Sequence, residues 1–575
     1  MARSVGIDAI YVVAPPAAMN LLSDGFVGDL ERRPTVKDKK TGEKRRATPA
    51  EFREKLRGLG VAYARVPDGG QNIATLAADA VLGLMQQNDL EPRDVGRLYG
   101  ATETSFDNSK PFTTDVKGMI EQRKGPGSTN KWHTVEYKFA CNAGGAAILD
   151  TADWILADPK RKSDRVGIVV ASDFAKYDLK SAGEWTGGAG AAAVLVRQSP
   201  RMLEIDPEIR GYSSREAYDF YKPAKMEKKP PAPEANGNGA VHVVNVLSLG
   251  ESDNGGLSFV SHLDTPIVNA RESIVSYNDT SRDIFDEVKQ KALEKRIKGK
   301  PVLEEGRSLL SIVSAIAPHI PYRGQPMVSY AEALLHDVRG GREGDEIATE
   351  MGPEPLREGF SSQRDFEDAK RKHVEKFMGT KQYRVQVAEK LAGPLTFAPF
   401  TGNTYTAAQL IATASMFASK IQDATAMSFG GHTRRPAITE MDRIVRKNRD
   451  VRNDFTGKHV LLSWYGSGAE AFGALATVAN GWKEQARKIR MPPVEHELTL
   501  AEYETLHKNY DTPIPSIAAI KEPSFRLTSI DHEGRRKYKY VEGETPLEVA
   551  LKKRQLTIAD LKIEPRKLEP ELVVR

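Results

Sequence analysis

Residues 139–147, FACNAGGAA, place a cysteine, Cys141, between an extended segment and a helix of small residues. Helical spacing of small and apolar residues continues over Gly144–Ile155. A β-branched run follows at Val166–Ala171, of the kind found in a central strand that is covered on both faces. A helix followed by a fully buried strand is typical of an α/β fold, in which helices cover the faces of a sheet.

Helices and strands alternate outward from this stretch in both directions. Further helices are predicted at Ile73–Gln86, Arg282–Arg296, Met327–His336, Arg364–Phe377 and Ala407–Lys420, and further strands at Val5–Val13, Val95–Ala101, Gly187–Val196, Ser308–Ala315 and His459–Trp464. Phe525–Ile530 and Lys537–Val541, joined by a short Gly-containing turn, predict a β-hairpin. Because the alternation occurs on both sides of residues 224–265, the sequence predicts two α/β halves.

Residues 224–265 interrupt the alternation. They contain KKPPAP at 228–233 and NGNG at 236–239, which is linker or insertion chemistry, so we expect a mobile segment. We therefore divide the chain into an N-terminal half (1–205), a connecting segment (206–265), a C-terminal half (266–490), and a C-terminal hairpin with a charged extension (491–575). The charged residues between about 30 and 58 are interpreted as a solvated surface excursion.

Composition excludes several classes of protein. The chain has 575 residues, 83 Lys and Arg against 78 Asp and Glu, a net charge of +5, and 40% hydrophobic residues. Global disorder and a strongly basic nucleic-acid binder are not indicated. There is no apolar run of about 18–20 residues and no secretory signal pattern, and the single cysteine allows neither an internal disulfide nor a cysteine-rich zinc site. We expect a soluble, cytoplasmic protein.

Cys141 is the first candidate for chemistry. The backbone N–H groups and positive dipole end of a helix N-terminus stabilise a thiolate, which predicts a lowered pKa and a nucleophilic role. The small residues that follow would let a thioester carbonyl approach the backbone. A buried cysteine that acts as a small hydrophobic residue is the alternative, and the pattern alone does not separate the two.

Two further side chains follow apolar strands. Glu103 comes directly after the strand that ends at Ala101, where a buried carboxyl with a raised pKa could act as a general acid or base. His319 lies between Pro318 and Pro321, where it could donate a hydrogen bond to a substrate carbonyl. For each residue taken alone, the pattern favours an ordinary surface or loop role over a catalytic one.

Two Gly-rich turns could supply backbone amides to an oxyanion: Thr401–Thr406, which contains Asn403, and Ser463–Gly468, which contains Gly466 and Ser467. Neither is followed by GK[ST], so a nucleotide P-loop is not supported. The histidines show no HExxH-type spacing, so no metal site is predicted.

Taken in order, these segments resemble the 3-hydroxy-3-methylglutaryl-CoA synthase family of the thiolase superfamily, over most of the chain. The matching motifs are ATETSFDNSKP around Glu103, FACNAGGAA around Cys141, VVASDFAKYD at 169–178, SAGEWTGGAGAAAVLV at 181–196, YDFYKP at 218–223, HIPY at 319–322, GNTYT at 402–406 and SWYGSG at 463–468. The resemblance implies a duplicated, five-layered αβαβα fold and a homodimer.

The resemblance also implies a mechanism. Cys141 would be acetylated by acetyl-CoA, Glu103 would remove a proton from the acetyl methyl group, and His319 would orient the carbonyl of acetoacetyl-CoA. Substrate and oxyanion contacts are assigned to Asn403, Ser467, Gly466, Tyr322 and Gly188. Hydrolysis would release 3-hydroxy-3-methylglutaryl-CoA for the mevalonate pathway of isoprenoid synthesis, without a cofactor or a metal. Partners would be the two CoA thioesters, with a thiolase or an acyl carrier protein as further candidates.

Departures from the family keep alternatives open. Many members have a lysine just after the HxPY motif, near the CoA phosphates, whereas this chain has Arg323, which is assigned to that contact instead. Trp185 and Gly187 also depart from the common pattern, so we expect a different wall of the substrate tunnel. The main alternative is the polyketide β-branching branch of the family, which acts on acyl-carrier-protein thioesters. A β-ketoacyl synthase or thiolase is disfavoured by the Glu103–Cys141–His319 set, and an alternative of another class is an inactive scaffold with this fold.

Overall fold

The computed structural model describes residues 4–38, 41–157, 166–228, 247–251, 257–262, 265–339, 341–421, 454–517, 522–532 and 534–541. Its centre is a mixed sheet with the strand order β18-β19-β20-β10-β1-β9-β8-β6-β7. In chain order these strands are β1 (Val5–Val13), β6 (Val95–Ala101), β7 (His133–Tyr137), β8 (Val166–Phe174), β9 (Ala189–Gln198), β10 (Leu203–Ser214), β18 (Val313–Pro318), β19 (His459–Gly466) and β20 (Glu470–Val478).

The sheet consists of two halves with matching strand patterns. In the N-terminal half, β7, β6 and β8 are parallel neighbours, and β9 and β1 follow as antiparallel neighbours. In the C-terminal half, β18 and β19 are parallel, and β20 and β10 follow as antiparallel neighbours. The halves join where β1 pairs with β10, from Val5↔Ile205 to Ile7↔Leu203. The expected duplication of an α/β unit is therefore confirmed.

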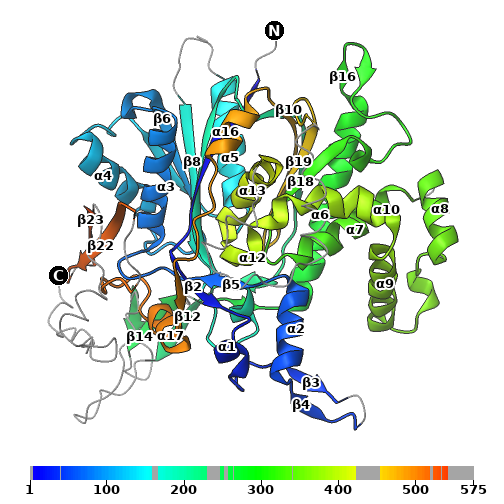
Figure 1. Cartoon of the computed structure of the whole chain (residues 1–575), viewed down its shortest axis with the longest axis horizontal. Helices are drawn as coiled ribbons and strands as arrows, with labels where there is room; N and C mark the ends of the chain where they lie inside the picture. Colours follow the sequence, from blue (N-terminus) through cyan, green and yellow to red (C-terminus); the bar gives the residue numbers. More distant parts are fainter. Residues whose placement is uncertain are drawn as a thin grey trace.

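Helices cover both halves in layers (Figure 1). The helices α3 (Ile73–Gln87) and α4 (Phe112–Lys124) cover one outer face, and α6 (Ala270–Glu294) and α7 (Gly324–Asp337) cover the other. Between the half-sheets lie α5 (Ala143–Leu156) and α13 (Ala408–Ile421). This arrangement confirms the five-layered αβαβα fold.

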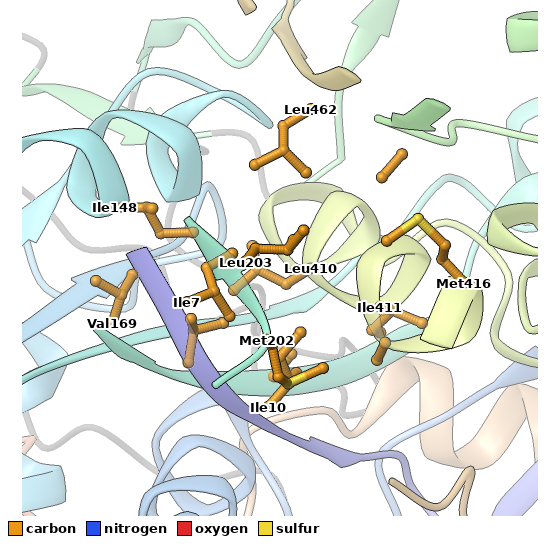
Figure 2. Close-up of a cluster of buried hydrophobic side chains, with 14 of the residues drawn as sticks. Ile7, Ile10, Ile148, Val169, Met202, Leu203, Leu410, Ile411, Met416 and Leu462 are labelled. Carbon is orange, nitrogen blue, oxygen red and sulfur yellow. The ribbon is translucent and has the colours of Figure 1, made fainter. Parts of the chain in front are cut away.

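Alternation along the strands builds the core on both faces of each half-sheet. On β8, Val169 faces the central layer, while its neighbours Ile168 and Val170 pack with α3 and α4. Figure 2 shows the central cluster, in which Ile148 of α5 and Leu410 of α13 lie among strand residues of both halves. Because both faces are covered, the central strands β8 and β9 are buried almost throughout, which agrees with the apolar pattern that predicted them from the sequence.

Smaller elements surround this core. They are α1 (Asp24–Gly28), α2 (Pro49–Leu59), α8 (Arg342–Met351), α9 (Gln363–Met378), α10 (Lys381–Tyr383), α11 (Glu389–Ala392), α12 (Ala398–Thr401), α16 (Trp482–Lys488) and α17 (Leu500–Lys508), with β2 (Ala17–Asn20), β3 (Thr35–Lys37), β4 (Lys44–Arg46), β5 (Tyr63–Arg65), β11 (Phe220–Tyr221), β15 (Ile267–Val268), β16 (Arg296–Ile297), β17 (Lys300–Pro301) and β21 (His496–Leu498). The charged stretch near residues 30–58 forms the β3–β4 hairpin and α2, whose Phe52 and Leu56 are buried, so it is only in part a solvated excursion.

The predicted C-terminal hairpin is confirmed as β22 (Ser524–Ile530) and β23 (Arg536–Val541). It lies beside α3 and α4 (Figure 1), where the Phe525 N–H donates to Asp79 Oδ1 at 2.8 Å and Gln122 Nε2 donates to the Tyr538 carbonyl at 3.0 Å. The extension after residue 541 lies outside the described residues.

Several boundaries predicted from the sequence were wrong by two residues or more; for example, the helix expected from Met327 begins at Gly324, and the strand expected to end at Ala171 ends at Phe174. The helix expected from Arg282 begins at Ala270, because the Asn269 side chain accepts a hydrogen bond from the Glu272 N–H and caps the helix there. The strand expected from Ser308 begins at Val313, because Ser308 caps a 3-10 turn over Leu309–Ser311. The strand expected from Gly187 begins at Ala189.

The connecting segment contains strands that the sequence did not indicate. β12 (Ala224–Lys228), β14 (Leu257–His262) and β13 (Leu247–Glu251) form a three-stranded antiparallel sheet. The mobility expected over 224–265 stays a prediction, and residues 229–246, 252–256 and 263–264 of this segment lie outside the described residues. The domain boundaries at 205, 265 and 490 stay predictions.

Among the described residues, no helix has both the length and the apolar character needed to cross a bilayer.

Candidate active site

Cys141 lies where the sequence predicted it, between an extended segment and a helix. The segment after β7 forms a bridge between Phe139 and Cys141, and Asn142 is the N-cap of α5. Ala140 has a positive φ of 39°, which turns the chain between the strand end and the helix. Cys141 is 8% exposed, so it is buried with only a narrow approach.

Glu103 lies two residues after β6, the strand that pairs with β7 in parallel. The carboxyl ends of parallel strands meet at the same edge of a sheet, so the two predicted residues come together there. Cys141 Sγ donates a hydrogen bond to Glu103 Oε1 at 2.8 Å. The structure therefore places the candidate nucleophile in direct contact with the candidate base.

The electrostatics of Cys141 correct one expectation. Burial and the negative charge of Glu103 raise the pKa of the Cys141 thiol well above its ordinary value, although the sequence predicted a lowered pKa. Desolvation and a neighbouring carboxylate therefore outweigh the helix N-terminus in the unliganded protein. The resting pair is best described as a thiol that donates its proton to a carboxylate.

The raised pKa predicted for Glu103 agrees with the structure. Burial raises the pKa of Glu103 to about 7, and Asp173 and Asp219 act in the same direction, while Lys222 and the Cys141 hydrogen bond oppose them. A carboxyl that titrates near neutral pH is matched to a role that both removes and returns protons.

Asp173 is a site residue that the sequence analysis did not single out. It is buried at the end of β8 and accepts hydrogen bonds from the Glu103 N–H at 2.9 Å, from the hydroxyls of Thr102 at 2.7 Å and Thr104 at 2.6 Å, and from the N–H of Thr406 at 3.0 Å and its hydroxyl. One carboxylate therefore fixes the Glu103 segment against the GNTYT turn. A charged residue at the end of an otherwise apolar strand was the available signal.

Asp219 has a similar role at the second Gly-rich turn. Its carboxylate accepts hydrogen bonds from the Tyr465 hydroxyl at 2.8 Å and the Gly468 N–H at 2.9 Å. Its own carbonyl accepts from the Asn269 N–H at 2.8 Å. The YDFYKP segment is thus bound to the SWYGSG turn.

His319 follows β18 and is 2% exposed. Its N–H donates to the Ser463 carbonyl at 2.8 Å, and its carbonyl accepts from the Tyr277 hydroxyl at 2.7 Å. Desolvation lowers its pKa to about 3, and its Nδ1 has no hydrogen-bond partner among the described residues. The imidazole is therefore neutral and has an unused polar atom. The Tyr465 ring lies 6.3 Å from its centroid, which ties His319 to the SWYGSG turn.

The structure brings the SWYGSG turn to the cysteine. A Cβ on Gly466 would lie 2.6 Å from the Phe139 carbonyl oxygen and 2.9 Å from the Asn142 nitrogen, so glycine is needed for this close approach. Ser467 is the next, half-buried residue. Asn142 Nδ2 also donates to Glu470 Oε2 at 3.0 Å, a second link between the two halves.

Asn403 and Gly188 lie at another close crossing. The Asn403 N–H donates to the Thr186 carbonyl at 2.7 Å, and Asn403 Oδ1 accepts from the Tyr405 N–H at 2.9 Å. A Cβ on Gly188 would lie 1.9 Å from the Thr401 carbonyl oxygen, so this position requires glycine for packing alone. Substrate contacts at both residues stay predictions.

Tyr322 and Arg323 are placed against the α2 region. The Tyr322 hydroxyl donates to Gln325 Oε1 at 2.7 Å. Arg323 is 5% exposed, and its side chain packs against Gly60, at the C-cap of α2. A CoA phosphate contact at Arg323 stays a prediction, and it would require the buried guanidinium to become accessible.

An aromatic wall that the sequence analysis did not identify completes the site. Tyr177, Tyr405 and Phe220 pack with Cys141, with Tyr405 and Phe220 ring centroids 5.7 Å apart. Tyr405 has a positive φ of 45° and a buried hydroxyl. The side chains packed around the nucleophile are therefore mainly aromatic rings.

Comparisons with known proteins agree with this geometry. Residues 52–200 match the family described as hydroxymethylglutaryl-coenzyme A synthase N terminal. The chain is 27% identical over 493 residues to a hydroxymethylglutaryl-CoA synthase of Haloferax volcanii, covering 84% of this chain and 92% of the relative.

Solved structures share the fold. MvaS in complex with 3-hydroxy-3-methylglutaryl coenzyme A superposes with a TM-score of 0.63 at 22% identity, covering 95% of this chain and 100% of that chain. The HMG synthase of the curacin biosynthetic pathway, in complex with acetyl donor-ACP, superposes with a TM-score of 0.60 at 16% identity, covering 94% and 100%. The sequence matches and the shared fold together show that the chain is similar to hydroxymethylglutaryl-CoA synthases over most of its length.

Proposed function

We propose that this protein is a hydroxymethylglutaryl-CoA synthase, which condenses acetyl-CoA with acetoacetyl-CoA and releases 3-hydroxy-3-methylglutaryl-CoA and CoA. The observation that carries the proposal is the 2.8 Å hydrogen bond from Cys141 Sγ to Glu103 Oε1, at the sheet edge reached by the SWYGSG turn. A nucleophile in contact with an acid–base group is the arrangement that covalent acyl transfer requires. The synthase relative that covers most of the chain supports the same reaction.

Acylation is the first step. Glu103 accepts the thiol proton, the sulfur attacks the carbonyl carbon of acetyl-CoA, and the bond from that carbon to the CoA sulfur breaks. The CoA thiolate leaves as the thiol after it takes the proton back from Glu103. Backbone N–H groups at Cys141 and in the SWYGSG turn would hold the carbonyl oxygen as it gains charge, an effect worth about 10²–10³ in rate per donor.

Condensation follows. Ionised Glu103 removes a proton from the methyl group of acetyl-Cys141, and the enolate carbon attacks the ketone carbon of acetoacetyl-CoA. Neutral His319 donates a hydrogen bond to that ketone oxygen, and protonated Glu103 returns its proton to the alkoxide. General acid–base catalysis typically contributes about 10²–10⁴-fold. Water then attacks the enzyme thioester, the bond to Cys141 Sγ breaks, and the sulfur recovers a proton.

Every proton in these steps moves between the substrates, water and the side chains of the chain, and no step needs an oxidant or a reductant. We therefore assign the enzyme no cofactor, and we place it at the step that commits CoA thioesters to isoprenoid precursors.

Carrier-bound substrates are the alternative, and the fold match to a synthase in complex with acetyl donor-ACP supports it. Steady-state synthase assays with free CoA thioesters and with carrier-bound thioesters decide between them. Turnover of free acetyl-CoA and acetoacetyl-CoA supports the proposal. Turnover of carrier-bound substrates alone would assign the protein to the polyketide branch. If neither substrate set is turned over and neither labels Cys141, the inactive scaffold is the remaining interpretation.

Assembly and location belong to the same proposal. The family resemblance favours a homodimer and a cytoplasmic enzyme. Light scattering on the full chain tests the dimer, and a single monomer mass at micromolar concentration would contradict it.

A further inference from the structure

Lys222 lies beside the catalytic pair and has no role in the scheme above. It is half-buried in the YDFYKP segment, directly after β11. Its Nζ donates a hydrogen bond to the Glu103 carbonyl oxygen at 3.1 Å and lies 5.2 Å from the centroid of the Tyr405 ring. One ammonium group thus contacts both the base segment and the aromatic wall.

The segment that leads into Lys222 is anchored to two other parts of the fold. Asp219, three residues earlier, is anchored to Tyr465 and Gly468. The intervening residues Phe220 and Tyr221 pair with β15. The backbone that carries Lys222 is therefore anchored in the fold and does not belong to a free surface loop.

The charges around this lysine are mainly acidic. Glu103, Asp173 and Asp219 face the reacting atoms from β6, β8 and the YDFYKP segment, and the phenols of Tyr177 and Tyr405 are close enough to act on Glu103. Lys222 forms no salt bridge with a residue in the described part of the chain. Its charge is therefore not cancelled by a direct contact, and it acts on the site as a whole.

We propose that Lys222 is a positioning residue that holds the Glu103 segment through its carbonyl and stabilises the single negative charge shared by the Cys141–Glu103 pair. The proposal deepens the synthase function and rests on it. In every step of the scheme this pair exchanges protons with substrate, and it carries one negative charge before the thiol is acylated. A fixed ammonium beside it favours that charge whether it lies on the sulfur or on the carboxylate.

Lys222 shifts the pKa values of Glu103 and Cys141 in the same direction. Lys222 lowers the pKa of Glu103 and of Cys141, against the upward shift from burial. An opposite charge within about 4–6 Å typically moves a pKa by about 1–3 units. Without the ammonium, Glu103 would bind its proton at higher pH, and less of it would be ionised for methyl proton removal at neutral pH.

The test uses the single cysteine of the chain, so alkylation by iodoacetamide reports on Cys141 alone. We compare the pH profiles of the alkylation rate, by intact mass, for the wild-type protein, Lys222→Met and Lys222→Arg. We expect the rise in rate to move to higher pH by about one unit or more in Lys222→Met, and to stay near the wild-type position in Lys222→Arg, which keeps the charge. Unchanged profiles in both variants would overturn the proposal.

Synthase kinetics give the second readout. A one-unit rise of the Glu103 pKa from about 7 leaves about one carboxyl in eleven ionised at pH 7, so kcat of Lys222→Met falls about fivefold at pH 7 and recovers near pH 9. A loss that is equal at all pH values would show a merely structural role and would overturn the proposal. Lys222→Gln serves the same purpose if Lys222→Met does not fold.

Lys420→Met is the matched control, because Lys420 Nζ lies 5.1 Å from the Phe455 ring centroid, on α13, and contacts neither Cys141 nor Glu103. It removes a comparable cation–ring contact and should leave both profiles at the wild-type position. The same shift in Lys420→Met would overturn a specific role for Lys222. A wild-type protein without synthase activity would refute the proposed function, while the alkylation profiles would still decide the role of Lys222.

Discussion

His319 gives a quantitative prediction that needs no substrate. It is buried, and desolvation lowers its pKa from 6.5 to about 3. A base with a lowered pKa in the folded state contributes stability that is complete above pH 6.5 and is lost as the pH falls toward 3. One pKa unit corresponds to about 1.4 kcal/mol, so the loss between pH 6.5 and pH 5 is about 2 kcal/mol.

Proton uptake measures this linkage directly. At pH 5 an unfolded histidine is about 97% protonated and folded His319 about 1%, so unfolding takes up about one proton per chain at this position. We predict that unfolding His319→Asn in urea at pH 5, in weakly buffered solution, takes up about one proton fewer than unfolding the wild-type protein. At pH 8 the two should agree. Equal uptake at pH 5 would refute the buried, neutral imidazole and, with it, the proposed hydrogen-bond donor.

The remaining predictions concern the acid–base machinery. Glu103→Ala should slow both acetylation of Cys141 and condensation, each by about 10²–10⁴-fold, because Glu103 accepts the thiol proton in the first step and the methyl proton in the second; acetylation at the wild-type rate in rapid-quench assays would contradict its role in acylation. In the wild-type protein, kcat for condensation should rise with pH to a plateau above about 7, since Glu103 must be ionised, and a flat profile from pH 5 to 8 would exclude Glu103 as the base. Asp173→Asn should lower kcat by about 100-fold with little change in KM, because one of the two carboxylate oxygens that accept from Glu103 and Thr406 becomes an NH₂ donor; a change confined to KM would assign Asp173 to substrate binding instead.

The sequence predicted some core elements closely, although it did not indicate β7, β10, β20 or α4. β6 was predicted as Val95–Ala101 and has these bounds, and the helix predicted at Ile73–Gln86 ends one residue later. Both elements are buried along most of their length, so the hydrophobic pattern begins and ends close to where the element does. Boundaries failed where a cap decided them, as at Asn269 and Ser308, because a capping side chain carries no hydrophobic signal.

The candidate site was predictable only in part. Cys141 and Glu103 could be found because each follows a strand, and the resemblance to a known family supplied their roles. The sign of the Cys141 pKa shift could not be predicted, because it depends on a carboxylate 38 residues earlier in the chain that the fold brings within 2.8 Å. Asp173, Asp219 and Lys222 were missed as site residues for the same reason, since their partners lie on distant segments.

The acetyl-enzyme is the central claim, and the lone cysteine makes it directly measurable. We would incubate the full chain with acetyl-CoA, record the intact mass, and then chase with acetoacetyl-CoA, with Cys141→Ala in parallel. The account predicts one acetyl group per wild-type chain, none on Cys141→Ala, and discharge of the label into 3-hydroxy-3-methylglutaryl-CoA during the chase. An acetyl group that remains on Cys141→Ala, or a label on Cys141 that the chase does not discharge, would contradict it.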